Sequence, residues 1–291
     1  MMIDLLAQTF VNGINLGALY GLAAVGLSLI FGVMKILNIA HGEFLMVGGY
    51  TAFWFFTLYG IDPFWGLPLV AVILFLLGAG CYKLLFSGVA KFMEETKIKN
   101  SLLVGFGLFL IIPQIARMLW TADERAITPA YSGGSFPILG IRIAYAPLGG
   151  IAVALVVILG LHLLLSKTYF GKSVRAASEN WKAAKLMGIN VDWTFLLTFA
   201  LGVAMAGLAG VLVGLTQVIT PAVGMTWTLK ALIVVVLAGM GSIGGAFLAG
   251  LILGVVEAVS AIFMGPYTIA LGMVIFLVIL MFRPQGLFGK V

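Results

Sequence analysis

Long runs of apolar residues, separated by short polar segments, cover almost the whole chain. The runs are long enough for helices that cross a membrane, and they lack the alternation of polar and apolar positions that a membrane β-barrel requires. The pattern predicts transmembrane helices at about residues 7–34, 39–59, 64–86, 101–120, 144–166 and 193–217. Residues 226–282 are long enough for three more crossings, with breaks near GMGSIGG and MGPY.

The predicted fold class is an all-α, polytopic transmembrane helix bundle with eight or nine membrane segments. We expect residues 1–291 to form a single transmembrane domain. Composition supports this, because 63% of the residues are hydrophobic, only 9% are charged, and the mean hydropathy is +1.20. Soluble domains are roughly 45–50% apolar and about 25% charged. The chain therefore cannot be a soluble protein, and its surroundings are a lipid bilayer.

The net charge of +6 comes from basic residues between the predicted spans. They cluster at residues 83–99, at residues 167–185 and at the C-terminal Arg283 and Lys290. The positive-inside rule places these three regions in the cytoplasm. With nine crossings, the N-terminus and the loop at residues 123–142 are both external. An even number of crossings would place the N-terminus in the cytoplasm instead. Since topology explains the basic residues, they do not indicate nucleic-acid binding.

Two glycine-rich segments hint at an internal repeat. NIAHGEFLMVGGY in the first half and GMGSIGGAFLAGLILG in the second each place a glycine-rich turn before an apolar helix. Many transporters consist of duplicated halves with the substrate route between them. Glycine-rich membrane chains also produce such similarities by chance, so both interpretations stay open.

The segment FGKSVRAASENWKAAKLMGIN, residues 170–190, is the charged exception in this apolar chain. As a single helix over residues 173–188 it places a mainly small-residue face on one side and a charged face on the other. The first face holds Ala177, Trp181, Ala184 and Gly188, and the second holds Arg175, Glu179 and Lys182. We expect a short amphipathic cytoplasmic helix whose small-residue face fits a groove on another protein.

Three interpretations of this segment compete. It is a solvated helix that only sets topology, a nucleotide site, or a coupling helix that receives force from a separate ATPase. The GKS tripeptide at Gly171–Ser173 does not make a phosphate-binding loop, because that motif requires a glycine where this chain has Ser166.

The string KAAKLMGIN, residues 182–190, resembles the cytoplasmic loop of ABC-importer permeases, whose core is E-A-A-x-x-x-G. Ala183, Ala184 and Gly188 match that core, whereas Lys182 stands where many families have Glu. The segments LNIAHGEFLMVGGY, GMGSIGGAFLAG and RPQGLFGK are similar to those of permeases from high-affinity branched-chain amino-acid importers. The matches occur in order and cover nearly the whole chain.

This resemblance implies a permease subunit that forms half of a transmembrane pore with a second, related permease. It implies two cytoplasmic ATPase subunits, a periplasmic substrate-binding protein and a bacterial inner-membrane location. The chain is then no enzyme and holds no cofactor, because ATP and Mg are bound by the ATPase partners. The coupling segment spans about residues 167–192, and the residues expected to serve it are Arg175, Glu179, Trp181, Lys182, Ala183, Ala184 and Gly188.

Two alternatives remain open from the sequence. One is a permease for urea or short-chain amides, since such permeases look similar. The other is an ATP-independent channel or secondary transporter, against which the coupling helix counts.

Four polar residues inside predicted spans are candidates for a translocation path or gate. Asn38, His41 and Glu43 lie near the cytoplasmic start of the second span, and Glu257 lies in the apolar run GLILGVVEAVSAIF. Ionisable residues in a span are costly and commonly functional. Packing at a broken helix end is the alternative for the first three, and Glu257 is expected to meet a polar partner at a subunit interface or along the path. Because His41 and Glu43 face different sides of a helix, we expect no metal site.

Overall fold

The computed structural model describes residues 2–138, 141–283 and 285–289, and these are mostly helical. The long helices are α1 (Met2–Met34), α2 (His41–Tyr59), α3 (Pro63–Cys81), α5 (Glu94–Trp120), α6 (Tyr145–Lys167), α7 (Tyr169–Leu186), α8 (Val191–Thr216), α9 (Val223–Ala238), α10 (Ile243–Met264) and α11 (Thr268–Phe282). A π-helical turn, η1 (Tyr82–Phe86), leads from α3 into α4 (Ser87–Val89), and a 3-10 turn, η2 (Gly265–Tyr267), joins α10 to α11. The all-α prediction is confirmed; Lys290 lies outside the described residues.

Within the described residues, six helices are long and apolar enough to cross a membrane by length and composition. They are Asp4–Met34, Pro63–Val89, Glu94–Trp120, Tyr145–Lys167, Val191–Thr216 and Ile243–Met264. Two shorter apolar helical stretches are Val223–Ala238 and Ala270–Ile279. The protein is therefore a polytopic helical bundle.

Local sequence explains where these helices begin and end. Gly60 ends α2 in the left-handed conformation, with φ of 65°, which glycine adopts without a Cβ penalty. Asp62 then caps α3 by accepting a hydrogen bond from the Phe64 amide at 2.9 Å. Pro63 occupies the first turn of α3, where its missing N–H is not needed. A tight reversal between α2 and α3 follows from these few residues.

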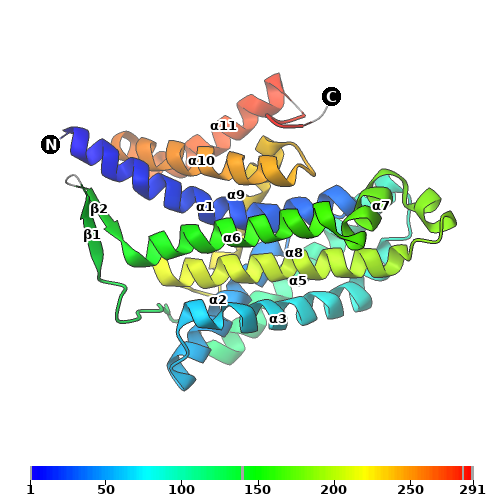
Figure 1. Ribbon diagram of the computed structural model, residues 1–291, viewed down its shortest axis with the longest axis horizontal. Helices are drawn as coiled ribbons and strands as arrows, with labels where there is room; N and C mark the ends of the chain where they lie inside the picture. Colours follow the sequence, from blue (N-terminus) through cyan, green and yellow to red (C-terminus); the bar gives the residue numbers. More distant parts are fainter. Residues whose placement is uncertain (1, 139–140, 284, 290–291) are drawn as a thin grey trace.

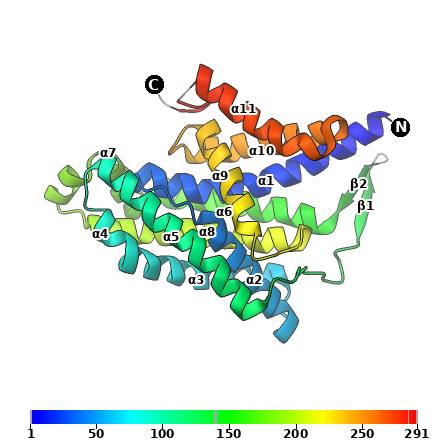
Figure 2. The same ribbon diagram turned by 180° about the vertical axis from the view of Figure 1, so that it is seen from behind.

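The core is built around α1 and α8. These two helices are almost wholly buried, whereas α3, α5, α6 and α10 leave most of their apolar side chains on the surface of the chain. Helix α1 packs against α10, α8 and α9, and α8 packs against α2 and α3 (Figures 1 and 2). The apolar outer faces are what a helix exposes to lipid or to another membrane subunit.

Glycines allow the closest of these contacts, between α1 and α10. A Cβ atom on Gly17 would lie 2.6 Å from the Cα atom of Leu251 and 2.9 Å from the carbonyl oxygen of Gly250. No side chain fits at that distance, so the two backbones touch. Small residues are the usual means by which membrane helices approach this closely.

Helices α2 and α9 begin deep inside the bundle. The imidazole Nε2 of His41, the first residue of α2, donates to the carbonyl of Ala23 at 3.0 Å. Ala23 lies 11 residues before the end of α1 at Met34, which is about 16 Å along the helix axis. Residues 35–40 therefore run back along α1 before α2 starts, and the first turn of α2 packs against the start of α9.

The loop after α5 is more ordered than the sequence predicts. Its Pro and Gly content predicts irregular structure, but β1 (Ser135–Ile138) pairs antiparallel with β2 (Ile141–Ala144). The side-chain amide of Gln8 on α1 exchanges two hydrogen bonds with the backbone of Arg142, at 2.9 and 2.8 Å. This hairpin therefore lies beside the N-terminal end of α1 (Figure 1).

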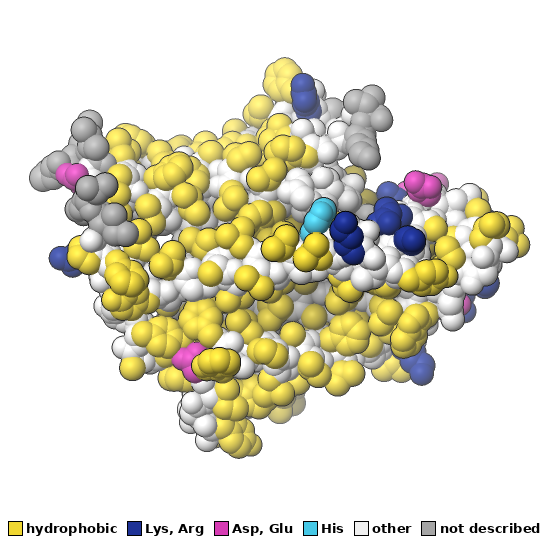
Figure 3. Space-filling view, viewed as in Figure 1, with side chains coloured by type: hydrophobic (Ala, Val, Ile, Leu, Met, Phe, Trp, Pro, Cys, Tyr) yellow, Lys and Arg dark blue, Asp and Glu magenta, His cyan; other side chains and the backbone are white. Residues whose placement is uncertain are grey.

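The two ends of the bundle differ in charge. Figure 3 shows Lys and Arg side chains gathered around the α7 end, while the middle of the molecule is mainly apolar. At this end Lys91, from the turn between α4 and α5, and Lys185 on α7 line the same small hollow. The β1–β2 hairpin lies at the opposite end (Figure 2). This arrangement agrees with basic loops that share one membrane side.

Candidate functional site

The charged segment forms two short helical pieces and not the single helix that its periodicity predicts. Asn180 interrupts α7 with φ of −153° and ψ of 95°. Its side-chain Oδ1 accepts hydrogen bonds from the amides of Lys182 at 3.1 Å and Ala183 at 3.0 Å, as an N-cap does. The second piece ends at Gly188, whose φ of 84° suits a glycine.

The break changes which side chains are accessible. Ala177 and Ala184 are only 3% and 5% exposed, because they pack inside this chain. Trp181 is half-buried, and the ammonium of Lys97 lies 5.5 Å from its ring centroid. The small-residue face predicted to meet another protein is thus largely occupied by the chain itself, and it anchors α7 to the bundle.

A different surface points outward at the end of α7. Leu186 and Met187 are 88% and 83% exposed, and they stand beside exposed Lys182, Ala183 and Gly188. We call these five residues the α7 tip. Two neighbouring apolar side chains this exposed at the polar end of a membrane protein indicate a contact surface.

The charged residues of α7 do not act together as one face. Arg175 donates to the backbone carbonyl of Leu165 on α6, so it ties α7 to the preceding helix. Glu179 and Lys182 are exposed. Among the described residues, the ion pairs that the spacing of Arg175, Glu179 and Lys182 would allow do not form. The structure thus places Arg175 away from the α7 tip.

Three of the intramembrane polar residues meet at the start of α2. Asn38, His41 and Glu43 are at most 1% exposed. The Asn38 side chain accepts a hydrogen bond from the Ala40 amide at 3.1 Å and so shapes the turn that begins α2. His41 points to α1, whereas Glu43 lies against Gly224 of α9, so the two side chains face different ways as their spacing predicts.

A direct hydrogen bond joins the beginnings of α2 and α9. The Gly42 amide donates to the Thr228 hydroxyl at 2.9 Å. A Cβ atom on Gly42 would lie 2.6 Å from the backbone nitrogen of Thr228, so only glycine fits there. We call this contact, together with Glu43 and Gly224, the α2–α9 junction. Broken helices that meet inside a membrane bundle are common at transporter binding sites.

Glu257 does not join this junction. It forms an ion pair with Lys230 of α9, and the two side chains are 12% and 6% exposed. The Lys230 ammonium also lies 5.3 Å from the centroid of the Tyr20 ring. The sequence analysis missed Lys230, although an acidic residue inside a span signals that a partner must exist. That partner, Lys230, is in the same chain, and the ion pair joins α9 to α10.

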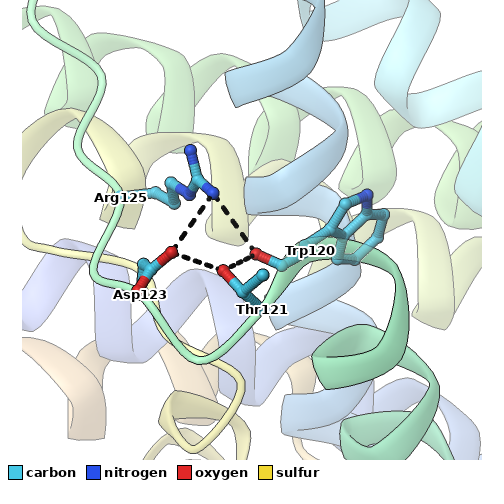
Figure 4. A network of polar contacts seen from close by, with 4 residues as sticks. All are labelled: Trp120, Thr121, Asp123 and Arg125. Atoms are coloured by element: carbon cyan, nitrogen blue, oxygen red, sulfur yellow. Dashed lines mark hydrogen bonds and ion pairs between the residues drawn. The ribbon is translucent and has the colours of Figure 1, made fainter.

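The C-terminal end of α5 carries a second polar cluster (Figure 4). After α5 ends, Arg125 donates to the carbonyl of Trp120 at 3.3 Å and lies 3.7 Å from the Asp123 carboxylate. Thr121, with φ of 66°, bonds to the same carboxylate. These contacts fold the chain back over the bundle directly after α5.

The folded-back loop is fastened to the end of α8. Arg125 and Ile219 exchange backbone hydrogen bonds at 2.9 and 2.7 Å, and Trp120 stacks on Tyr50 of α2 with 4.5 Å between ring centroids. Further along the loop, burial and the nearby Asp62 carboxylate raise the pKa of Tyr131, so its phenol stays neutral. We call residues 120–125 with Ile219 the α5 cap. The sequence analysis did not find it, since its partners are far apart in the chain.

These features define a class: a polytopic membrane protein with an internal junction of short helices and an exposed tip at its basic end. The branched-chain amino acid transport system permease component family matches residues 9–283. The chain belongs to this family, which confirms the resemblance seen in the sequence.

Relatives match along nearly the whole chain. The high-affinity branched-chain amino acid transport system permease protein BraD of Pseudomonas aeruginosa is 33% identical over 97% of this chain and 95% of BraD. LivH of Salmonella typhimurium, with the same description, is 31% identical over 97% of this chain and 95% of LivH. A probable branched-chain amino acid transport permease protein LivH of Methanocaldococcus jannaschii is 28% identical over 92% of this chain and 88% of its own. No solved structure matches the chain.

Proposed function

We propose that this chain is the permease subunit of an ABC importer that carries branched-chain, aliphatic amino acids across the bacterial inner membrane. The observation that carries the proposal is the family match over residues 9–283, together with relatives that match over nearly their whole length and are described as branched-chain amino acid permeases. Those descriptions favour this substrate class over urea or short-chain amides.

We propose nine crossings. Six come from the long apolar helices, α11 adds one, and α2 and α9 each complete one together with the non-helical residues that precede them. An odd number places the N-terminus outside and the basic end inside. Glycines in α2, beginning at Gly42, and the glycine-rich turn that precedes α10 support a duplicated origin of the two halves.

ATP-driven force enters through the α7 tip in this proposal. Leu186 and Met187 bind a groove on a cytoplasmic ATPase, and buried Ala177 and Ala184 pass the movement to the bundle. Lys182 lies beside them, where an acidic residue would occupy the related loop. Two such ATPase subunits, a second related permease and a periplasmic binding protein complete the importer; ATP and Mg bind to the ATPases.

The α2–α9 junction is proposed as the gate. Asn38, His41 and Glu43 lie at the start of α2, which begins inside the bundle, and movement of α2 against α9 would open or close the route. Glu257 holds α9 to α10 through Lys230 and so keeps one side of the gate fixed. Packing is the competing role, and the tests below separate the two.

Co-purification tests the proposal. We would isolate the tagged chain from its native membrane in mild detergent, as wild type, as the double variant Leu186→Glu/Met187→Glu, and as Met93→Glu. Met93 is 74% exposed and apolar but lies outside α7, so it controls for the added charge. We expect an ATPase with wild type and Met93→Glu, and its loss from the double variant. Leucine uptake by the chain reconstituted without any ATPase would overturn the proposal.

A further inference from the structure

A cavity of about 190 Å³ opens beside the α2–α9 junction. It lies between α2, α5, α9 and the segment that connects α8 to α9. Its polar lining residues are Glu43, Gln114 and Arg117, and its apolar wall includes Phe109, Pro221 and Met225. A carboxylate, a guanidinium and an apolar wall therefore border one small space.

Glu43 supplies a buried carboxyl group that has no ion-pair partner among the described residues. The residue is 1% exposed, and its Oε2 atom has no hydrogen-bond partner in the described part of the chain. No basic nitrogen of the described residues lies within ion-pair distance of this carboxylate. It stands in the first turn of α2, where the helix dipole favours an anion. A buried carboxylate is costly, so this group is either protonated or meets a cation that enters the cavity.

Arg117 supplies the opposite charge on α5. Nearly all of the apolar window of α5 is on the surface of the chain, yet Arg117 and Gln114 interrupt it. The Arg117 guanidinium donates to the Gln114 side-chain oxygen at 3.3 Å. Arg117 lies one turn before the end of α5, close enough for its head group to reach water, but it lines the same cavity as Glu43. Charged residues within a membrane helix usually face a polar path and not lipid.

The size of the space limits its occupant. About 190 Å³ equals the volume of roughly six water molecules at about 30 Å³ each. Drug-sized ligands need about 300 Å³ or more. Pro113, which also lines the cavity, has no N–H to donate to the Phe109 carbonyl, so that oxygen can accept another hydrogen bond. The space suits one small molecule that is charged at one end and apolar at the other.

We infer that this cavity is a substrate-contact site, in which Glu43 receives the ammonium group of an amino acid and Arg117 its carboxylate. The side chain of the amino acid then contacts Phe109, Pro221 and Met225. The inference rests on the proposed function, because it assigns residues to an aliphatic amino acid on its route through the permease. Glu43 and Arg117 line one cavity without forming a direct ion pair among the described residues, so both charged groups are available to a zwitterion.

The position of the cavity is consistent with a binding site along the translocation route. Pro221 follows two residues after Ile219, which fastens the α5 cap, and Glu43 belongs to the α2–α9 junction. An occupant would therefore contact Pro221, two residues after Ile219, on one side and Glu43 of the junction on the other. Movement of α9 would change the width of the cavity through Met225.

Direct binding tests the inference. The assembled permease–ATPase complex in nanodiscs, without binding protein, would be titrated with radiolabelled leucine. We expect Glu43→Gln and Arg117→Gln each to weaken binding at least tenfold, with Arg117→Lys recovering part of it. Met118→Gln is the matched control, since Met118 is the next residue on α5, is 86% exposed and does not line the cavity; it should bind leucine like wild type.

Competition separates recognition from a structural role. Isoamylamine, which lacks the carboxylate, should compete poorly in wild type and almost as well as leucine in Arg117→Gln. The α-keto acid of leucine, which lacks the ammonium, should gain in the same way in Glu43→Gln. A purely structural role would weaken all three ligands equally, and that result would overturn the inference.

The outcomes also separate this inference from the proposed function. If the wild-type complex hydrolyses ATP and imports leucine, but both cavity variants bind leucine like wild type, the cavity inference fails and the proposed function stands. If wild type assembles with no ATPase and imports no leucine, the proposed function fails. Co-elution of the ATPase with each variant shows that it has folded. If one neutral variant fails to assemble, Arg117→Lys and the competition series in the other neutral variant decide the outcome.

Discussion

Lys230 and Glu257 form an ion pair that joins α9 to α10 and is almost completely enclosed by the chain. Lys230 would otherwise be an isolated charge in an apolar helix, and Glu257 likewise. The ion pair offsets the free-energy cost of burying each of the two charges. The pair thus has a structural function inside one subunit. This distinguishes Glu257 from Glu43, which forms no ion pair with any described residue.

This pairing predicts non-additive effects of mutation. Glu257→Gln or Lys230→Met alone should destabilise the protein by about 3–5 kcal/mol, because each leaves a buried charge without its partner. The double variant Lys230→Met/Glu257→Leu should recover most of that loss. Thermal unfolding of the detergent-solubilised protein measures this. A double variant as unstable as the sum of the single variants would contradict the coupling.

The contact between α1 and α10 predicts a position-dependent effect of one methyl group. Gly17→Ala should destabilise the protein by about 1–3 kcal/mol, because the new Cβ atom would overlap the Leu251 backbone. Gly160→Ala on α6 is the control: no atom of the described residues outside its own helical turn lies within 4 Å of its Cβ position. Alanine favours a helix by about 1 kcal/mol over glycine, so this control should be neutral or slightly stabilising. Equal loss of melting temperature in both variants would refute close packing as the cause.

The cap at Asn180 predicts local loosening of the α7 tip. Asn180→Ala removes both side-chain hydrogen bonds and should cost about 1 kcal/mol. Asn180→Asp keeps the acceptor oxygen and should behave like wild type. Amide hydrogen exchange across residues 181–187 reports the change, with faster exchange expected only in the alanine variant. Unchanged exchange there would show that the cap does not hold the second helical piece.

The hydrogen bond at the α2–α9 junction predicts a difference between two small substitutions. Thr228→Val keeps the shape but leaves the buried Gly42 amide without its acceptor, at a cost of about 1–3 kcal/mol. Thr228→Ser keeps the hydroxyl and should preserve function. We expect slower leucine uptake by the valine variant at normal complex assembly. Full uptake by Thr228→Val would argue that the junction does not take part in gating.

The sequence predicts the helix limits well where polar residues mark them. Residues 144–166 and 193–217 were expected as spans, and α6 and α8 occupy Tyr145–Lys167 and Val191–Thr216. The expected breaks near GMGSIGG and MGPY separate α9, α10 and α11. The start of α5 was placed too late, at residue 101 and not Glu94, because its first two turns are charged and resemble a loop in hydropathy.

The break at Asn180 shows a limit of predicting helices from periodicity alone. The periodicity of residues 173–188 fits one helix, but an Asn side chain competes with the helix for the backbone amides that follow it. The preference of Asn for N-cap positions was the available signal. Burial of Ala177 and Ala184 could not be predicted, since a small-residue face suits packing within the chain as well as packing against a partner.

The sequence by itself determined that this is a membrane protein of helices, which loops are basic, and to which family it belongs. Hydropathy, charge bias and motif order are properties of contiguous residues, so they can be read along the chain. Only the tertiary structure decided that Glu257 pairs with Lys230, 27 residues away, and that Glu43 shares a cavity with Arg117. Such contacts depend on how far each helix is shifted and rotated against its neighbours, and backbone contacts between glycines and the lengths of α2 and α9 set those shifts.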